Sequence, residues 1–546
     1  MALGPEQLIE AAVRQSLIDG ETLNKLRLDA RRARLDLLDT VAAHYRLPIS
    51  AFYQAAAELR GLPYINPIHH ISEQKLLKRV PQALARRKLV LPLSENDEGV
   101  MVATADPDDR ITLDALQRIF GQRVQAVVAE PEALTAALGR NLASAPGQKA
   151  AQANLTVVDT DLISMLDGIL KEAYLRRASD VHLALEESGL RVRLRVDGKL
   201  QDYYIDADAS VTNGLISRVK VLSNLDIAEQ REPQDGGMSY YLAPPIDAEF
   251  NIRVATAPTR LGERVTMRLL GQEAQSLTLP LLGMSDADML HFRQAIRKPF
   301  GMILLTGPTG SGKSTTLFAA LQEINNPELN IMTVENPIEY VMDGISQIQT
   351  GPKISFASAL RSLLRHDPDV LMVGEIRDEE TADVALKAAM TGHLVFSTLH
   401  TNTAAGTVAR LADIGCEPYL IGSTMNAVIA QRLVRKLCPL CRKPRTVTED
   451  EARLLGQEGK QVTIYEPVGC AACQGRGYRG RLGLFETLWF DEALAKLVAN
   501  ECTEDELEVH AIASGQLNVM WNDGSAKVMA GLTSLSELQA VAVKRH

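Results

Sequence analysis

Apolar residues recur at helical spacing through the first 62 residues of the chain. Leu8, Ala11, Ala12 and the polar Ser16 repeat at this spacing, and a similar series lies within residues 35–41. Residues with this spacing lie on one face of a helix. We therefore predict an N-terminal helical domain at residues 1–62.

Residues 63–142 mix strand and helix patterns. Short apolar runs at residues 89–93 and 100–104 are typical of strands, and a helix is predicted to begin near Thr112. We interpret this stretch as an α/β accessory domain. Residues 143–154 are small and polar, as is typical of a linker.

Polar and apolar residues alternate strictly at residues 191–196, which predicts a strand with one buried and one charged face. Asp197-Gly198 follows it and is typical of a hairpin turn. A further strand is predicted at residues 264–270. These features predict an α+β middle domain at residues 155–273.

From residue 279 to residue 546 the pattern changes to continuous apolar runs separated by helical segments. Such runs occur at residues 301–306 and 370–373, and a third strand is predicted at residues 391–400. Strands that are apolar on both faces are typical of a mostly parallel sheet covered by helices. The last part of the chain is therefore predicted to be an α/β domain.

Composition narrows the possible functions. The chain has 546 residues, of which 46% are hydrophobic, which is enough for three or four domains. Its net charge of −10 and its 4% aromatic content do not favour nucleic-acid binding, so no nucleic-acid partner is expected. The sequence contains no apolar run of membrane-spanning length and no recognisable signal peptide. We expect a cytoplasmic protein whose membrane association, if any, is peripheral.

A complete phosphate-binding loop lies between an apolar run and a helical segment. The loop consists of Gly307, Pro308, Thr309, Gly310, Ser311, Gly312, Lys313, Ser314 and Thr315. Glycines let backbone N–H groups turn towards phosphates, and the following helix N-terminus adds favourable partial charge. Lys313 is expected to reach the β- and γ-phosphates, and Ser314 to bind Mg²⁺. A chance glycine-rich turn is the alternative, which the strand–loop–helix context disfavours.

Carboxylates suited to phosphoryl transfer follow two other apolar runs. Glu375 follows the run at residues 370–373, which predicts a position at the carboxyl edge of the sheet, where nucleotide sites form. Glu335 and Glu339 follow a second run, and Pro337 between them favours an irregular turn over a helix. The alternative for each acid is a charge that simply faces solvent.

Histidine and arginine residues supply further candidates. His400 ends the predicted strand at residues 391–400 and is a candidate sensor of the γ-phosphate, whereas His393 is interpreted as an ordinary polar group. Arg361, Arg365 and Arg377 are candidates to add positive charge near the phosphates. The alternative for the arginines is a solvated basic surface.

Two Cys-x-x-Cys pairs predict a metal site. Cys438 and Cys441 form the first pair, and Cys470 and Cys473 form the second. Four thiolates suit tetrahedral Zn²⁺ and leave no open position for catalysis, so the zinc is predicted to be structural. A redox-active dithiol is the main alternative.

Together these motifs resemble the ATPases that power type II secretion and type IV pilus assembly, and the resemblance covers nearly the whole chain. It rests on the phosphate loop, an acidic box, a second nucleotide motif and a histidine box, at residues 307–315, 334–340, 367–378 and 392–402. The tetracysteine element follows residues 431–437, where this family has it. Residues 178–182 and 231–236 look like the family's middle domain, and residues 63–142 like its accessory domain.

The resemblance implies a RecA-like P-loop ATPase core, a PAS-like middle domain at the nucleotide interface, and a zinc-binding insertion at residues 436–483. It implies a homohexamer that hydrolyses ATP with Mg²⁺ and holds Zn²⁺ in the insertion. Glu375 corresponds to the carboxylate near the attacking water, and His400 to the sensor. The remaining catalytic positions correspond to Glu335 and Glu339 in the acidic box and to the middle-domain arginines Arg231, Arg253 and Arg268.

The implied role is to power pilin or pseudopilin polymerisation. The implied partners are a polytopic inner-membrane platform protein and other inner-membrane assembly components that the N-terminal domains would contact, so the chain would associate peripherally with the inner membrane. The tetracysteine element favours assembly or secretion ATPases over the shorter retraction ATPases. Four residues depart from those common in the family without removing a phosphate-, metal- or water-handling group: Asn251, Asn336, His366 and Thr403. Residues 1–62 show no clear match to the motif that binds cyclic di-GMP in some relatives, so that regulation is not expected.

Two other functions stay open at this point. A conjugation or DNA-processing ATPase on the same core would require a basic channel and turnover stimulated by nucleic acid. A regulatory paralogue that binds nucleotide without hydrolysing it is disfavoured because Lys313, Ser314, Glu375 and His400 are all present. Measured turnover distinguishes the second of these from an ATPase.

Overall fold

The computed structural model describes residues 2–70, 72–143, 158–187, 189–205, 207–270 and 278–544. Contacts divide the chain into two compact units, each described separately below. The first consists of Met1–Leu270 with Cys438–Cys441 and Val468–Gly477. The second consists of Gly271–Leu437, Arg442–Pro467 and Tyr478–His546.

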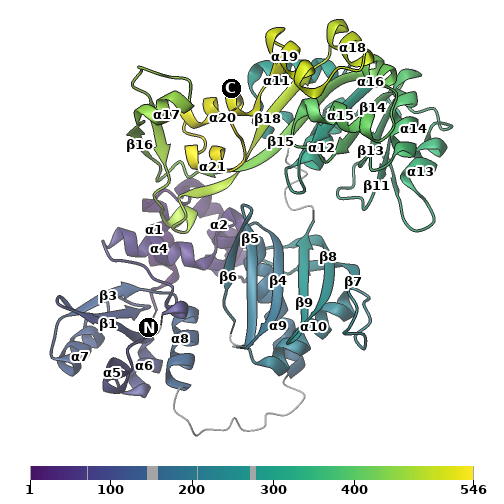
Figure 1. Ribbon diagram of the computed structural model, residues 1–546. Helices are drawn as coiled ribbons and strands as arrows, with labels where there is room; N and C mark the ends of the chain where they lie inside the picture. Colours follow the sequence, from purple (N-terminus) through teal and green to yellow (C-terminus); the bar gives the residue numbers. More distant parts are fainter. Residues whose placement is uncertain are drawn as a thin grey trace. The chain divides into compact units, whose positions relative to one another are not determined.

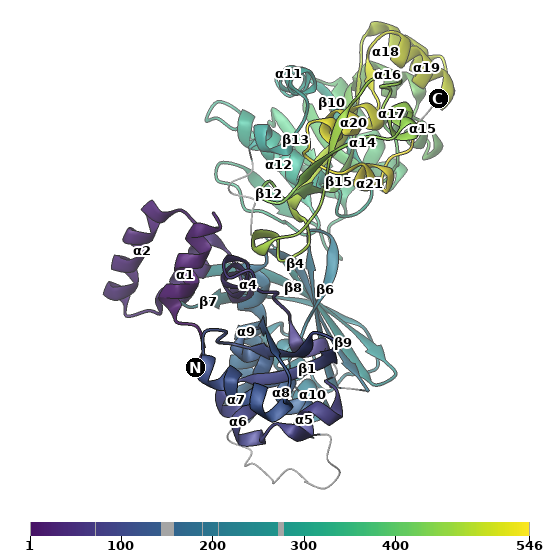
Figure 2. The same cartoon turned by 90° about the vertical axis from the view of Figure 1, so that its left-hand side faces the viewer.

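The first unit begins with the predicted helices. They are α1 (Pro5–Arg14), α2 (Gly20–Ala33), α3 (Leu37–Tyr45) and α4 (Ile49–Leu59). Side-chain caps begin two of them, since Asp19 accepts a hydrogen bond from the N–H of Thr22 and Asp36 from that of Asp39. Helix α1 contacts α4 (Figure 2). Helix α2 contacts α3. Ser16, the polar residue of the first predicted series, lies beyond the end of α1.

A small α/β arrangement follows in the first unit. Its elements are η1 (Pro67–His69), α5 (Gln74–Arg79), α6 (Gln82–Lys88), β1 (Val90–Asn96), β2 (Gly99–Thr104), α7 (Arg110–Phe120), β3 (Val124–Val128) and α8 (Pro131–Ala143). Strands β1 and β2 are antiparallel, whereas β2 and β3 are parallel. The two predicted strands and the predicted helix are confirmed. The predicted linker lies outside the described residues except for its first residue, Ala143.

A six-stranded antiparallel sheet forms the rest of the first unit (Figure 1). Its order is β6-β5-β4-β9-β8-β7. The elements are α9 (Val158–Leu175), β4 (Ala178–Glu186), β5 (Gly189–Val196), β6 (Lys199–Tyr203), α10 (Ala209–Leu222), β7 (Gln234–Leu242), β8 (Ala248–Thr259) and β9 (Gly262–Leu269). One face of the sheet packs on α9 and α10, because alternate residues such as Val192 and Leu194 join the same buried cluster as Leu166 and Leu215.

The turn between β5 and β6 is the predicted hairpin turn. Asp197 and Gly198 both have positive φ, 51° and 81°. Two consecutive positive φ values define the turn that matches the twist of antiparallel strands. The alternating burial predicted at residues 191–196 is confirmed along β5.

The second unit contains an eight-stranded sheet of order β12-β11-β13-β14-β10-β15-β18-β19. Strands β12 to β15 of this order run parallel, and β18 and β19 are antiparallel additions at one edge. The strands are β10 (Gly301–Thr306), β11 (Ile331–Glu335), β12 (Ser346–Gln349), β13 (Val370–Val373), β14 (Leu394–Leu399), β15 (Met425–Leu437), β18 (Tyr478–Trp489) and β19 (Leu517–Asn518). The predicted, mostly parallel sheet is confirmed.

Helices cover both faces of this sheet. They are α11 (Asp286–Ala295), α12 (Lys313–Ile324), α13 (Phe356–Leu363), α14 (Glu379–Met390), α15 (Ala404–Asp413), α16 (Pro418–Thr424), α18 (Glu492–Ala499), α19 (Glu504–Ala513), α20 (Met520–Met529) and α21 (Leu535–Gln539), preceded by η3 (Leu279–Leu282). Met302 and Leu304 of β10 face the cluster that holds α13 and α14, whereas Ile303 and Leu305 face the cluster of α11 and α12. The central strand is therefore buried on both sides, as its continuous apolar run predicts.

Strands β15 and β18 form a long antiparallel pair, and the chain between them carries the two cysteine pairs. It also carries β16 (Lys443–Thr446), α17 (Glu449–Leu454), β17 (Thr463–Glu466) and η4 (Ala471–Cys473). Within the described part of the chain, no helix combines the length and the apolar character that crossing a membrane requires.

Candidate nucleotide site and metal centre

The phosphate loop connects the end of β10 to the beginning of α12. Gly307, Gly310 and Gly312 all have positive φ, 140°, 78° and 90°. A Cβ atom at Gly307 would lie 2.4 Å from the carbonyl oxygen of Gln431, so only glycine fits there. Gly312 is also the N-cap of α12, which leaves the first N–H groups of that helix available to an anion.

Lys313 is held within the loop itself. Its Nζ donates hydrogen bonds to the carbonyl oxygens of Gly307 (2.7 Å) and Pro308 (3.2 Å). Burial lowers the pKa of the Lys313 ammonium to about 8, and the negative charges of Glu375 and Glu339 act against this shift. Lys313 is therefore the cation of the loop and lies within the electrostatic range of two of the predicted acids.

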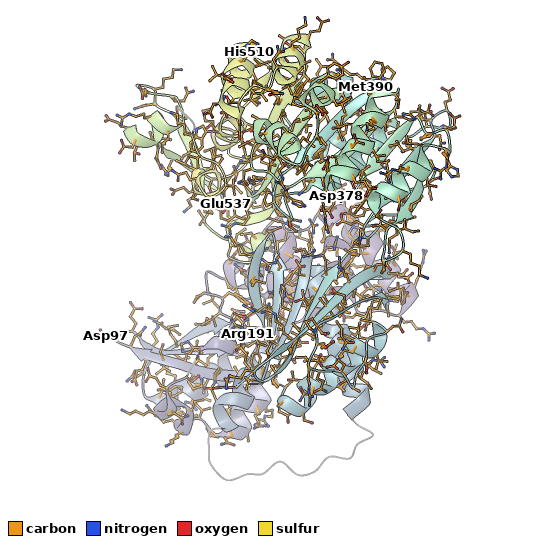
Figure 3. The ribbon with its side chains drawn as sticks, turned by 45° about the vertical axis from the view of Figure 1, so that its right-hand side comes forward. Asp97, Arg191, Asp378, Met390, His510 and Glu537 are labelled. Carbon is orange, nitrogen blue, oxygen red and sulfur yellow. The ribbon has the colours of Figure 1, made fainter. Side chains whose placement is uncertain are left out.

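Glu375 and His400 meet at the carboxyl edge of the sheet. The Nε2 atom of His400 lies 3.3 Å from Oε2 of Glu375, and Nη2 of Arg377 lies 2.5 Å from Oε1. The Glu375 side chain is 15% exposed and that of His400 is 49% exposed. Asp378 then caps α14 by accepting from the N–H of Thr381, and Figure 3 labels Asp378 and Met390 at the two ends of this helix. The structure thus brings together the carboxylate, the sensor candidate and one of the candidate arginines.

The acidic box forms an irregular turn, as Pro337 predicts. Glu335 ends β11 and is buried, and its Oε1 accepts hydrogen bonds from Thr333 Oγ1 (2.7 Å) and Gln347 Nε2 (2.9 Å). Burial raises the pKa of the Glu335 carboxyl. Glu339 is exposed. Glu335 therefore anchors its own loop, whereas Glu339 is exposed and its charge acts on Lys313.

Two further residues, Gln431 and Arg432, contact the phosphate loop and were not predicted from the sequence as site residues. Gln431 of β15 accepts a hydrogen bond from Thr316 Oγ1 at 2.9 Å through Oε1, and its carbonyl oxygen lies against Gly307. Arg432 lies beside Gly307 and donates to Oδ1 of Asn402 at 2.9 Å. Burial lowers the pKa of Arg432, against the opposing charge of Glu486. No local sequence pattern predicts this position, because Gln431 and Arg432 reach the phosphate loop only through the parallel pairing of β10 with β15.

The middle-domain arginines belong to the first unit. Arg253 of β8 and Arg268 of β9 are direct cross-strand neighbours, and both are about half exposed. Arg268 pairs with the buried Asp180 at 2.9 Å. Arg231 is exposed and lies in a loop that the buried Lys220 holds by donating to the carbonyl oxygen of Glu229. Like charges directly opposite on a sheet are unfavourable, and here a carboxylate beside each arginine offsets the repulsion: Asp180 for Arg268 and Asp235, at 3.9 Å, for Arg253.

The other candidates have ordinary surroundings. Arg361 pairs with Glu380 at 2.7 Å on an exposed surface, and Arg365 lies beyond the end of α13 and donates to the carbonyl oxygen of Arg361. These contacts match the alternative of a solvated surface. His393 Nδ1 lies 2.9 Å from the carbonyl oxygen of Ala388, as expected of an ordinary polar group.

The four cysteines form one cluster. Their ligand atoms lie within 4.8 Å of one another, and the Sγ atoms of Cys438 and Cys470, and of Cys441 and Cys473, are 3.8 Å apart. Four thiolates at about 2.3 Å from one Zn²⁺ ion would be separated by roughly 3.8 Å. The donor set therefore fits Zn²⁺.

Backbone groups and the N-terminal helices surround the cluster. The N–H groups of Gly469 and Gly477 point at Cys441 Sγ (3.2 Å) and Cys473 Sγ (3.1 Å), which stabilises thiolate charge. Cys438 and Cys473 are buried in the same cluster as Phe52 of α4. The N–H of Ala471 donates to Oε1 of Glu58 at 2.9 Å, at the end of α4. The metal element and the helical domain therefore share one core.

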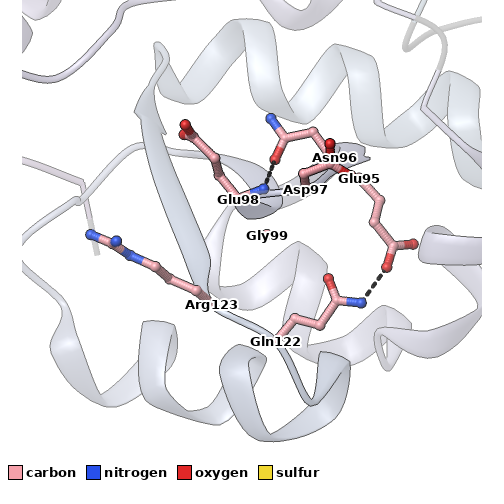
Figure 4. Close-up of a pocket in the computed structure, with 7 residues that line it drawn as sticks. All are labelled: Glu95, Asn96, Asp97, Glu98, Gly99, Gln122 and Arg123. Carbon is pink, nitrogen blue, oxygen red and sulfur yellow. Dashed lines mark hydrogen bonds between the residues drawn. The ribbon is translucent and has the colours of Figure 1, made fainter.

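A separate hollow lies at the β1–β2 turn (Figure 4). Its rim contains Glu95, Asp97 and Glu98, with Arg123 on the other side. Oε1 of Glu95 accepts from Gln122 Nε2 at 2.6 Å. Three exposed carboxylates around one arginine do not suit a triphosphate, so we assign no nucleotide to this hollow.

Comparison with known proteins agrees with the geometry. The sequence model described as "Type II/IV secretion system protein" matches residues 157–540, well over half of the chain. The chain belongs to this family. A second model, described as the MshEN domain, matches residues 60–148. The family predicted from the sequence is confirmed.

Individual relatives differ in how much of the chain they match. The type IV pilus assembly ATPase PilB of Myxococcus xanthus is 36% identical over 558 residues, which cover 97% of this chain and 98% of the relative. The type II secretion system ATPase E of Vibrio cholerae is 47% identical over 386 residues, 70% of this chain and 76% of the relative. The structure of the ATPase DotB of Legionella pneumophila has a TM-score of 0.53 at 23% identity and covers 72% of this chain and 97% of DotB, which supports the RecA-like fold.

As a member of the type II/IV secretion family, the chain is an ATP hydrolase that uses ATP with Mg²⁺. Its cysteine cluster fits Zn²⁺. The predictions of the fold class, of the enzyme and of its cofactors are therefore confirmed.

Proposed function

We propose that this ATPase works as a homohexamer that powers the assembly of a type IV pilus. The observation that carries the choice of pilus is the match to the pilus assembly ATPase over 97% of the chain, which includes the N-terminal domains. The type II secretion relative matches only 70% of the chain, although at the higher identity of 47%. Pseudopilus assembly in type II secretion is therefore the second candidate.

The proposed catalytic roles follow the geometry of the site. N–H groups of the loop and of α12 bind the phosphates, Lys313 neutralises the β- and γ-phosphates, and Ser314 binds Mg²⁺. Glu375 orients the attacking water. His400, whose Nε2 lies 3.3 Å from Oε2 of Glu375, senses the γ-phosphate. Glu339 supports the metal and water from the acidic box, and Glu335 positions that box through its buried hydrogen bonds.

The proposed source of additional positive charge is the middle domain. Arg253 and Arg268 place two neighbouring guanidinium groups on one exposed sheet surface, where Asp235 is the carboxylate partner of Arg253 and Asp180 that of Arg268. Arg231 adds a third guanidinium group from the neighbouring loop. An arginine that completes the site in the transition state accelerates related reactions by roughly 10³–10⁵-fold. Closure of the middle domain on bound ATP would then couple hydrolysis to domain movement.

In the cell, the proposed motor lies in the cytoplasm and associates peripherally with the inner membrane. A polytopic platform protein would receive the movement, and other inner-membrane assembly components would bind the N-terminal domains. No nucleic-acid partner is proposed. We propose these partners on the basis of the family to which the chain belongs.

Crosslinked recovery of the tagged protein from native membranes, with mass spectrometry of the captured chains, tests this proposal. Recovery of a pilus platform protein supports pilus assembly. Recovery of a secretion platform protein selects the second candidate, and recovery of DNA-transfer proteins would contradict both. Sedimentation of the ATP-bound protein tests the hexamer, and a single-chain mass under those conditions would exclude it.

A further inference from the structure

The segment after β14 is held by a network of threonine hydroxyl groups. The N–H of Thr401 donates to Oγ1 of Thr306 at 2.8 Å, and the two Oγ1 atoms are 2.7 Å apart. Thr401 Oγ1 also lies 2.7 Å from Oγ1 of Thr407 on α15. Thr306 and Thr407 are completely buried. Leaving a buried hydroxyl without a hydrogen-bond partner costs free energy. Movement of the Thr401 backbone would break these hydrogen bonds, so the network holds that backbone in place.

A second contact holds the same segment from β15. Nη2 of Arg432 donates to Oδ1 of Asn402 at 2.9 Å, and Nη1 donates to the carbonyl oxygen of Gln431 at 3.3 Å. The guanidinium lies beside Gly307, where a Cβ would be 3.0 Å from Nη1. Arg432 thus contacts the first glycine of the phosphate loop and the residue after Thr401 together.

These two contacts connect the phosphate loop to the sensor candidate. Thr306 is the last residue of β10 and directly precedes Gly307, while His400 directly precedes Thr401. Only one peptide bond separates each end of the Thr306–Thr401 contact from a residue of the nucleotide site. His400 in turn lies 3.3 Å from Glu375.

We propose that Thr306 and Arg432 are positioning residues that hold His400 against Glu375 and fix its orientation relative to the phosphate loop. Neither side chain needs to touch ATP for this role. Thr306 acts through Thr401, and Arg432 acts through Asn402. The inference rests on the proposed roles of Glu375 and His400.

The Thr306→Val variant tests the inference because valine keeps the shape of threonine and removes the hydroxyl. A displacement of about 1 Å at a catalytic group can cost roughly 100-fold in rate. We expect kcat for ATP hydrolysis to fall roughly 10- to 100-fold, with the affinity for a fluorescent ATP analogue changed less than about twofold. Thr306→Ser keeps the hydroxyl and should stay within about threefold of the unmodified protein in kcat.

Thr424→Val is the matched control. Thr424 is buried, and its hydroxyl donates to the carbonyl oxygen of Leu420 at 2.7 Å, on α16. Its loss removes a comparable hydrogen bond outside the nucleotide site. We expect a similar decrease in thermal stability for Thr424→Val and Thr306→Val, but a decrease in kcat only for Thr306→Val.

A double-mutant cycle with His400→Ala separates positioning from general stability. If Thr306 acts through His400, then adding Thr306→Val to His400→Ala changes kcat by less than about twofold. Asn402→Ala, which removes the acceptor of Arg432 and keeps its charge, should lower kcat and show the same lack of additivity. Independent, multiplying effects would overturn the inference, as would a tenfold loss of nucleotide affinity in Thr306→Val.

The same cycle distinguishes this inference from the proposed catalytic roles. A loss of kcat in His400→Ala without a loss in Thr306→Val would overturn the positioning role alone. Full activity in His400→Ala would overturn the sensor role and the inference that depends on it.

Discussion

Replacing Gly307 with alanine is expected to abolish tight nucleotide binding without unfolding the ATPase unit. A Cβ at this position would lie 2.4 Å from the carbonyl oxygen of Gln431 and 2.8 Å from Ser311 Oγ, both inside the 3.0 Å that real Cβ contacts respect. The closer obstacle is the backbone of β15, which cannot rotate away as a side chain would. The loop must therefore move if the alanine is to fit.

The cost has two parts. Overpacking of this kind costs about 1–3 kcal/mol, and a φ of 140° costs an L-residue roughly a further 1–3 kcal/mol. The sum is about 2–6 kcal/mol, and 1.4 kcal/mol corresponds to a tenfold change in affinity. If displacement of the loop carries this cost, ATP affinity falls by roughly 30-fold or more.

The assay is titration with a fluorescent ATP analogue, with phosphate release measured in parallel and thermal unfolding used to confirm the fold. Gly351→Ala is the matched control, because a Cβ there meets open space among the described residues and Gly351 does not require positive φ. We expect the control to bind within about twofold of the unmodified protein. Gly307→Ala binding as tightly as the control would refute the close approach of β15 to the loop.

Three further predictions concern pH, metal and a buried ion pair. Burial holds the pKa of Lys313 at about 8 in the free protein, and bound phosphates raise it, so ATP affinity should be full below pH 8 and decline by up to about tenfold per pH unit above it. Calorimetry at pH 8.5 in two buffers should detect proton uptake on ATP binding. An ATP affinity that stays constant from pH 7 to 9 would contradict this prediction. Purified protein should contain close to one zinc per chain by elemental analysis. Cys470→Ser should lose the zinc and destabilise α4, since zinc binding in such sites contributes roughly 10–16 kcal/mol of folding free energy. Zinc retained in this variant would argue against the site. Glu263→Gln breaks the pair with Lys220, whose side chains are 7% and 1% exposed, and should lower the opening free energy of β9 in hydrogen exchange by about 3–5 kcal/mol. The exposed pair of Glu187 with Arg260 supplies its control, Glu187→Gln, with an expected loss below about 1 kcal/mol, and equal losses in the two variants would contradict the reasoning.

Local sequence signals were sufficient for much of the nucleotide site. The loop at residues 307–315 is a contiguous motif, and apolar runs locate Glu375 and His400 at strand ends, so parallel pairing brings them to one edge. The cysteine pairs likewise announce their cluster through spacing. Pro337 correctly predicts that Glu335 and Glu339 do not lie on a helix.

Residues whose role depends on distant pairing could not be predicted. Gln431 and Arg432 reach the phosphate loop only because β15 lies beside β10 in the sheet, an arrangement between strands more than a hundred positions apart. Thr306 looks like the end of an apolar strand, and only the fold gives its hydroxyl the partner Thr401. The shared core of the cysteine element and α4 could not be predicted for the same reason, since no sequence pattern in either segment indicates contact with the other.

The proposed mechanism requires Lys313 to bind the phosphates and Glu375 to direct the water that cleaves them. Single-turnover hydrolysis in Glu375→Gln, measured beside nucleotide binding and beside Lys313→Ala, tests it most directly. We expect Glu375→Gln to bind ATP normally but to cleave it at least about 100-fold more slowly, and Lys313→Ala to lose both binding and turnover. Cleavage at the unmodified rate in Glu375→Gln, or near-normal hydrolysis in Lys313→Ala, would contradict it.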